Sequence, residues 1–300
     1  MKGYHDIASD GGSEILAQVR AQQESVERSL AGVRHLLAVG SGKGGVGKST
    51  LTMQLACALR ERGHAVSILD ADLNGPCQAR LGSLAPGILL PGAGGAAVPA
   101  TGSGIGVVSL GALFPEPRAV EFASVAPDAA HTWRATREFT VLRELLAGMD
   151  WGRLDFLLID LPPGAERMAQ YAELLGPAAL FVLVTVPSDL ARGVVARSLD
   201  ALAKTPNRIL GYVENMQGYT CPDCGSRRAL FPGRSRVALE LPRLGSVPFD
   251  PELAALCDRG GTAGDGVAES ARRSLRRIAE EICRRVDGDT ERAPAHQETA

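Results

Sequence analysis

The sequence lacks long hydrophobic runs, a strong excess of charge of either sign and a dense set of cysteines. The uncharged stretch 81–115 is rich in glycine and broken by proline, and the more apolar stretch 174–188 is short and contains two prolines. Neither resembles the roughly 20 continuous apolar residues of a membrane-spanning helix. The net charge of −2 gives no general attraction to nucleic acid or to an anionic membrane. Six unevenly spaced cysteines indicate a reducing compartment rather than a disulfide framework.

The overall composition is that of a globular protein. Hydrophobic residues make up 45% and charged residues 22% of the 300 residues, which is enough for a sizeable core. This composition excludes a collagen-like or wholly disordered chain. The first residues include acids and Gly-Gly with no apolar segment, unlike a secretory signal. We therefore expect a cytoplasmic protein with no membrane and no nucleic-acid partner.

Short apolar runs alternate with helical patterns along the chain. The runs are rich in Val, Ile and Leu without strict alternation, which is typical of strands buried on both faces of a parallel sheet. They cover residues 35–39, 66–69, 105–110, 156–159, 180–186, 209–213 and 244–247. Helices are expected at 13–32 (with Ser13 as its N-cap), 49–62, 136–147, 165–175, 192–203, 237–240 and 267–286. The alternation predicts an α/β fold with a doubly wound, mostly parallel sheet flanked by helices.

A glycine-rich loop lies between the first apolar run and a predicted helix. Residues 42–50 read Gly-Lys-Gly-Gly-Val-Gly-Lys-Ser-Thr, which fits the P-loop pattern G-x-x-x-x-G-K-[ST]. Glycines let backbone N–H groups point inward around phosphate oxygens, and the positive end of the helix adds to the field. Lys48 is expected to contact the β- and γ-phosphates, and Ser49 to ligate Mg²⁺. The predicted nucleotide-binding residues of the loop are Gly42, Gly44, Gly45, Val46, Gly47, Lys48, Ser49 and Thr50.

Acidic residues follow two of the apolar runs. Asp72 comes shortly after the run 66–69, where an acid beside a P-loop can hold a metal-bound water or orient the attacking water. A turn or helix cap is the alternative role for Asp72. Asp160 ends the run 156–159 in the Walker B pattern, so we expect it to reach Mg²⁺ through water. The Pro-Pro-Gly at 162–164 stops that strand and sets a turn beside the γ-phosphate.

Cys221 and Cys224 form a C-x-x-C pair, which supplies half of a tetrahedral ligand set. Three interpretations are open: a redox pair, half of a zinc knuckle, or a site shared by two copies of the chain. In the third, four thiolates meet across a two-fold axis and hold a [4Fe–4S] cluster or a zinc ion. No thioredoxin-like context and no second ligand pair accompanies the motif, but spacing alone does not choose among the three.

Lys43, a second lysine in the loop, resembles the signature lysine of the deviant Walker A class, which includes MinD, ParA, the nitrogenase iron protein and the arsenite-pump ATPase. In that class the lysine reaches the nucleotide of a partner subunit. The resemblance therefore implies a homodimer with nucleotide at its interface, in which Lys43 acts as an arginine finger does. It also implies that Asp72 is the water-activating residue of a switch I segment (residues 70–76), so Lys43, Lys48 and Asp72 are the predicted catalytic residues.

Five stretches make the chain similar to the Mrp/ApbC family of iron–sulfur cluster carriers. They are 38–49, 70–76, 150–155, 159–164, and Glu-Asn-Met at 214–216 followed by Cys-Pro-Asp-Cys-Gly at 221–225. The resemblance implies a Mg²⁺-dependent ATP hydrolase that bridges one labile [4Fe–4S] cluster between the cysteine pairs of two copies. ATP hydrolysis is then coupled to cluster transfer onto apoprotein clients. Asn215 matches a position that often contacts the adenine.

The chain departs from that family in the segment 160–167, the switch II segment. The family pattern continues Pro-Pro-Gly with Thr-Gly-Asp, whereas this chain has Ala165, Glu166 and Arg167. The missing hydroxyl, glycine and acid predict weak hydrolysis, or weak coupling of hydrolysis to the cluster. Two other functions stay open: a positioning ATPase of the ParA/MinD type, and a zinc-bridged regulatory dimer with degraded ATPase activity. GTP stays open as an alternative to ATP.

The expected organisation has three parts. Residues 1–34 are an N-terminal tail and helix, residues 35–286 are the P-loop ATPase domain with the cysteine pair inserted at 221–224, and residues 287–300 are a disordered tail. Within the domain, the glycine-rich stretch 82–104 is expected to be a surface loop or a partly ordered excursion. The basic, amphipathic helix 267–286 is expected to pack its apolar stripe against the sheet.

Overall fold

A computed structural model describes residues 15–87, 90, 94–112, 130–221, 224–231, 237–261 and 269–290. Seven strands form one sheet in the order β11-β8-β7-β1-β6-β2-β4, and every neighbouring pair is parallel. Each of the seven predicted apolar runs supplies one of these strands. The strands are β1 (Val33–Ser41), β2 (Val66–Asp70), β4 (Gly106–Val108), β6 (Leu154–Asp160), β7 (Leu180–Thr185), β8 (Ile209–Glu214) and β11 (Arg243–Ser246).

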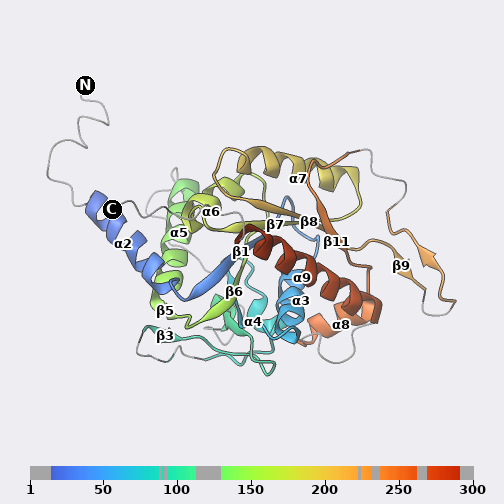
Figure 1. Ribbon diagram of the computed structural model, residues 1–300, viewed down its shortest axis with the longest axis horizontal. Helices are drawn as coiled ribbons and strands as arrows, with labels where there is room; N and C mark the ends of the chain where they lie inside the picture. Colours follow the sequence, from blue (N-terminus) through green and yellow to red (C-terminus); the bar gives the residue numbers. More distant parts are fainter. Residues whose placement is uncertain are drawn as a thin grey trace.

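Helices cover both faces of this sheet (Figure 1). Successive residues of a strand point to opposite faces, so Leu37 and Val39 of β1 join one core cluster while Leu36 and Ala38 join the other. The first cluster includes side chains of α3 (Lys48–Glu61) and α9 (Glu269–Thr290). The second includes side chains of α2 (Ile15–Ser29), α5 (Ala130–Gly148), α6 (Arg167–Leu175) and α7 (Asp189–Leu202). The predicted doubly wound α/β class is confirmed.

Smaller elements complete the described fold. Helix α4 (Gln78–Leu81) and the 3-10 helix η1 (Leu110–Ala112) flank the end of β2, and α8 (Pro251–Asp258) follows β11. Two small sheets pair β3 (Ala96–Ala97) with β5 (Met149–Asp150) and β9 (Tyr219–Thr220) with β10 (Arg227–Arg228). Strand β3 lies in the stretch predicted to be a surface loop, so the described part of that stretch is partly ordered. No described helix combines the length and apolar composition needed to cross a bilayer.

Three predictions about local structure need correction. Residues 237–240 are not helical, because Arg192 Nη1 donates to the carbonyl of Val237 (3.1 Å) and the Val237 N–H donates to Asp189 Oδ1 (3.3 Å). Strand β1 begins at Val33, so the expected domain boundary after residue 34 falls inside it. Helix α9 continues to Thr290, and Arg34 Nη2 of β1 bonds Asp287 Oδ1 at 3.3 Å, so 287–290 belong to the helix.

Other terminal predictions lie outside the described residues. These are the loose N-terminal tail, the Ser13 cap and the last ten residues of the expected C-terminal tail. Helix α8 is not among the helices expected with defined bounds, although its signal is present in the sequence. Asp250 precedes Pro251, and its Oδ1 accepts the N–H groups of Glu252 (3.0 Å) and Leu253 (3.3 Å), which is an ordinary N-cap with proline in the first turn.

Candidate nucleotide and thiol site

The predicted phosphate loop connects the carboxyl end of β1 to the start of α3. Gly45 and Gly47 have φ values of 78° and 80°, in the left-handed region that favours glycine. A Cβ atom at Gly47 would lie 2.3 Å from Nδ2 of Asn215, the residue that follows β8 (Ile209–Glu214). Asn215 Nδ2 donates to the carbonyl of Val46 at 2.9 Å. The structure therefore brings Asn215 to the loop, and its contact with the adenine stays a prediction.

Lys48 and Asp160 meet beneath this loop. The Lys48 ammonium forms an ion pair with Asp160 Oδ1 and a 3.0 Å hydrogen bond with Ser49 Oγ. The pair is desolvated, since the side chains of Lys48 and Asp160 are 6% and 0% exposed. The structure thus assembles the three residues predicted to serve the phosphates and Mg²⁺. Thr50 lies beside them in the first turn of α3.

Gln78 is a member of this cluster that the sequence did not indicate. Its Nε2 donates to Asp160 Oδ2 (2.8 Å) and to the carbonyl of Ser49 (3.0 Å), which fixes the orientation of the amide. Its Oε1 is buried and has no hydrogen-bond partner among the described residues. A buried acceptor without a donor is uncommon, so this oxygen is free to accept a hydrogen bond or to ligate a cation. Gln78 opens the four-residue helix α4, and no motif spacing marks it.

Asp70, at the end of β2, is a second buried carboxylate that anchors the switch I segment. Its Oδ2 accepts the N–H groups of Cys77 and Gln78 and the hydroxyl of Ser109, each at 2.9 Å. Burial raises the pKa of Asp70 to about 7, and the neighbouring charge of Asp160 contributes to the rise. Asp70 therefore titrates near neutrality in the folded protein.

Asp72 and Lys43 are two of the three predicted catalytic residues, and the structure shows different contacts for each. Asp72 is half-buried, and its Oδ1 accepts the N–H of Gly75 at 3.2 Å, which is the turn-capping contact considered as its alternative role. Its water-orienting role stays a prediction. Lys43 is half-buried in the loop, and within the described part of the chain its ammonium forms no ion pair.

The cysteine pair lies between the two short strands β9 and β10, which project from one edge of the molecule (Figure 1). The Cys221 N–H donates to the carbonyl of Ser226 (3.0 Å), and the Gly225 N–H donates to the carbonyl of Cys221 (2.9 Å). Cys221 is half-buried and Cys224 is exposed. Pro222 and Asp223 lie outside the described residues.

The hydrogen bonding of Cys224 suits it to metal binding. Cys224 Sγ and Ser226 Oγ share a 3.0 Å hydrogen bond, and this bond is the main reason that the pKa of Cys224 is lowered. A lowered pKa favours the thiolate, which is the form that binds metals. Within the described residues, no group of three or more His, Cys, Asp or Glu side chains is placed to hold a metal ion. A complete thiolate site therefore needs ligands from beyond this cysteine pair.

The hairpin and the phosphate loop lie at the same end of the sheet. The hairpin leaves from the carboxyl end of β8, and the residues just before β9 bond the segment after β11: the Gln217 N–H donates to the carbonyl of Val247 (2.9 Å), and the Phe249 N–H donates to that of Gly218 (2.8 Å). Asn215, which contacts the loop, is the residue directly after β8. Ligands of open parallel sheets bind at the carboxyl ends of the strands, so both predicted sites follow that rule.

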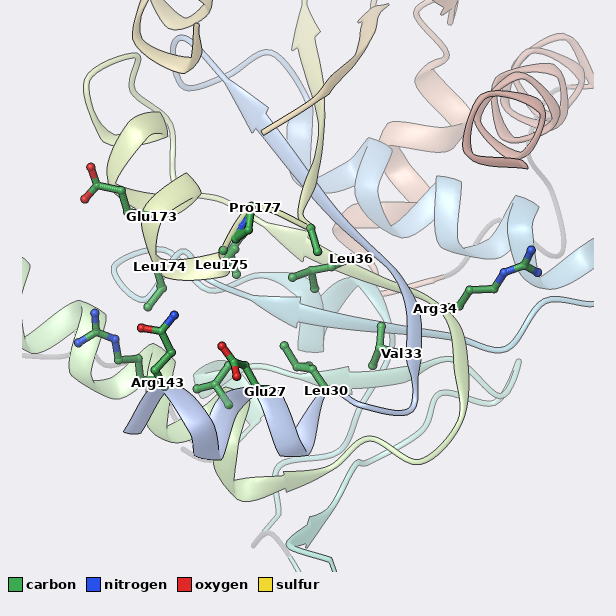
Figure 2. A pocket seen from close by; sticks show the side chains of 14 residues that line it. Glu27, Leu30, Val33, Arg34, Leu36, Arg143, Glu173, Leu174, Leu175 and Pro177 are labelled. Carbon is green, nitrogen blue, oxygen red and sulfur yellow. The ribbon is translucent and has the colours of Figure 1, made fainter. Parts of the chain in front are cut away.

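Two cavities lie at opposite ends of the sheet strands. One, of about 440 Å³, lies beside the loop and is lined by Gly42, Gly164 and Arg167 among others. The other, of about 370 Å³, lies between α2, α6 and the start of β1. Figure 2 shows Leu30 and Leu36 pointing into it. Because the second cavity is at the amino end of the strands, it is not the nucleotide site.

A parallel doubly wound sheet with a P-loop at a strand end and two carboxylates beside it defines a P-loop nucleotide-binding protein. The sequence model of one group of such proteins, described as ParA: NUBPL iron-transfer P-loop NTPase, matches residues 32–286. The chain therefore belongs to the NUBPL family of iron-transfer P-loop NTPases, and the resemblance inferred from its motifs is confirmed.

Individual relatives agree with this family. The cytosolic Fe-S cluster assembly factor NUBP2 of Gallus gallus is 38% identical over 282 residues, covering 89% of this chain and 97% of the relative. An iron-sulfur cluster carrier protein of Aquifex aeolicus is 36% identical over 242 residues, covering 78% of this chain and 62% of the relative.

Solved structures agree with the fold. A nucleotide-binding protein of Archaeoglobus fulgidus, solved in complex with ADP, has a TM-score of 0.65 and 32% identity, with 79% of this chain and 90% of that chain covered. The cell division ATPase MinD of Pyrococcus furiosus has a TM-score of 0.59 and 23% identity, with 84% of this chain and 99% of the MinD chain covered. This likeness shows the shared fold.

Proposed function

We propose that this protein is an ATP-dependent carrier of iron–sulfur clusters. Two copies hold one [4Fe–4S] cluster as cargo on Cys221 and Cys224 of each chain and deliver it to apoprotein clients. The observation that carries the proposal is the shared position of the two sites: the thiol hairpin grows from the strand end at which Asn215 contacts the phosphate loop. The names of relatives as cluster assembly factors and cluster carriers support the same conclusion.

The ligand count supports a shared cargo site. Each chain offers two thiols on a projecting hairpin, and the described residues supply no third ligand there. A two-fold axis doubles the pair to four thiolates, which is the set that a [4Fe–4S] cluster takes. During delivery, each iron–thiolate bond to the carrier is replaced by one to a client thiolate.

The loop cluster fits Mg²⁺ and a nucleoside triphosphate. Mg²⁺ prefers oxygen ligands, and the buried Oε1 of Gln78 without a donor lies in a cluster with the Ser49 hydroxyl and the Asp160 carboxylate. Ser49 and Asp160 would hold Mg²⁺, which would supply positive charge against the β- and γ-phosphates. Lys48 would exchange its ion pair with Asp160 for the phosphates, and Asp72 would orient the attacking water.

Lys43 is assigned to the partner subunit's nucleotide. The ammonium forms no ion pair within the described residues, so it is available for a trans contact across a dimer interface. A lysine supplied in trans neutralises charge on the transferred phosphoryl group and makes hydrolysis depend on dimer formation. We infer a cytoplasmic location because several relatives are named cytosolic.

Anaerobic reconstitution with iron and sulfide tests the proposal. We expect visible iron–sulfur absorption, about two iron atoms per chain and a dimer by light scattering, because four irons bridge two copies. Cys221→Ser and Cys224→Ser should each abolish the absorption. Cys77→Ser is the matched control and should leave it unchanged, since Cys77 lies in the loop after β2 and not on the hairpin. Tight zinc at one ion per two chains, or a monomer without metal, would contradict the carrier function.

A further inference from the structure

A single buried carboxylate on α5 touches both segments that border the nucleotide site. Glu138 is 3% exposed. Its Oε1 accepts Asn74 Nδ2 at 2.9 Å, and its Oε2 forms an ion pair with Arg167 Nη2. Both oxygens of the carboxylate are therefore occupied, one by a neutral donor and one by a cation. Glu138 itself lies on a helix that supplies none of the predicted nucleotide-binding residues.

The two donors come from the two switch segments. Asn74 lies in the switch I segment two residues after Asp72, and the intervening Leu73 is 2% exposed, which anchors this turn in the core. Arg167 ends the switch II segment and begins α6. The same switch II segment is bound to the strand before the phosphate loop, because the Gly164 N–H donates to the carbonyl of Ser41 at 3.0 Å.

Aromatic packing holds the Arg167 side chain in place beside Glu138. The guanidinium lies over the ring of Tyr171, 5.6 Å from its centroid, and donates to the Tyr171 hydroxyl at 3.3 Å. Tyr171 is 1% exposed and packs against Phe139, the neighbour of Glu138 on α5, with ring centroids 5.2 Å apart. A displacement of Arg167 would leave the buried Glu138 carboxylate without its counter-ion, which is strongly unfavourable.

We propose that Glu138 is a positioning residue that makes the switch I and switch II segments move as one unit. The inference rests on the proposed ATP hydrolysis, in which Asp72 and the switch II segment must reach the γ-phosphate together. Glu138 acts through its two donors and touches no nucleotide. Loss of either donor weakens the hold on the other, because a carboxylate with one partner is free to reorient. Arg167, at a position where the chain departs from the family pattern, thus acquires a defined role.

Three single variants test this coupling. Asn74→Ala removes the hydrogen bond from the switch I segment to Glu138, and Asn74 is an exposed residue. Glu138→Gln removes the charge with little change of size. Glu144→Gln makes the same chemical change at an exposed position of the same helix and serves as control. We measure kcat and KM for ATP, the Kd of a fluorescent ADP analogue, and amide hydrogen exchange of residues 70–76 and 160–167.

Coupling predicts a specific combination of results. Asn74→Ala and Glu138→Gln should lower kcat by about tenfold, the effect of losing one hydrogen bond to a charged group, and leave the Kd within about twofold. Exchange should rise in both segments of Asn74→Ala, although only the switch I segment has lost a contact. Glu144→Gln should match the wild type. Arg167→Lys is also measured alone and combined with Asn74→Ala, and the combined variant should be less damaging than the product of the two single effects.

Two outcomes would overturn the inference. One is faster exchange confined to residues 70–76 in Asn74→Ala, and the other is multiplicative single effects on kcat in the combined variant. If the wild type hydrolyses no ATP, the proposed hydrolysis fails. The exchange measurements need no turnover and still decide whether Glu138 couples the two segments.

Discussion

Gly47 offers a quantitative test of the contact between the phosphate loop and Asn215. Gly47→Ala places a methyl group in the left-handed region, at φ 80°, which costs about 1–2 kcal/mol. The same methyl would lie 2.3 Å from Asn215 Nδ2, so the Asn215 amide must leave its 2.9 Å bond to the Val46 carbonyl. Asn215 is 8% exposed, and an unpaired buried donor adds about 1–3 kcal/mol. The expected destabilisation is therefore about 2–5 kcal/mol.

Gly45 provides the matched control in the same loop. Its φ is 78°, and a Cβ atom there meets nothing within 4 Å. Gly45→Ala should therefore show the backbone term alone, about 1–2 kcal/mol. Urea unfolding of the nucleotide-free protein gives both free energies of unfolding, and the m-values should not change.

A double variant isolates the side-chain term. In the Asn215→Ala background the methyl at position 47 no longer meets an amide, so the additional effect of Gly47→Ala should fall to that of Gly45→Ala. Equal effects of Gly45→Ala and Gly47→Ala in the wild-type background would refute the reasoning. So would an undiminished effect of Gly47→Ala when Asn215 has been truncated.

Three further predictions use the buried and reactive groups of the site. The pKa of Asp70 is raised to about 7, so the folded state binds the proton more tightly than the unfolded state. Stability should therefore fall as pH rises from about 4 to 7, and Asp70→Asn should flatten this slope in urea unfolding. Glu214 is 2% exposed and paired with Arg192, so Glu214→Ala should lower the free energy of unfolding by about 3–5 kcal/mol, and an effect below 1 kcal/mol would contradict that pairing. Cys224 should be alkylated before Cys77, whose pKa burial raises to about 12, when iodoacetamide modification is followed by mass spectrometry. Ser226→Ala should slow Cys224 alkylation, and an unchanged rate would show that the hydroxyl does not stabilise the thiolate.

The sheet was predictable because its strands are buried on both faces. A run such as 156–159 has no polar alternation, since Leu157 and Leu158 each face a helix-covered core. The P-loop was predictable for a related reason, because its chemistry requires fixed residue types at fixed spacing. The helix predicted at 237–240 was wrong, and there the backbone of Val237 is bonded by two side chains of α7, which a local pattern does not contain.

The contacts of Gln78 and Glu138 could not be predicted from the sequence. Gln78 bonds Asp160 across 82 residues, and Glu138 bonds Asn74 across 64 residues, so no local spacing relates the partners. The cysteine spacing predicted two ligands but not the hairpin that carries them. Strands β9 and β10 have two residues each, which is too short to leave a hydrophobic period.

The shortness of that hairpin bears on how a bound cluster leaves. Only two residue pairs join β9 to β10, and one further bridge, from Tyr219 to Phe249, ties β9 to the segment after β11, so few backbone bonds hold the hairpin. With so few backbone bonds, its loosening requires far less free energy than unfolding the seven-stranded sheet. For the proposed cluster carrier, release and reloading would then require only fraying of this hairpin and no unfolding of the nucleotide-binding core.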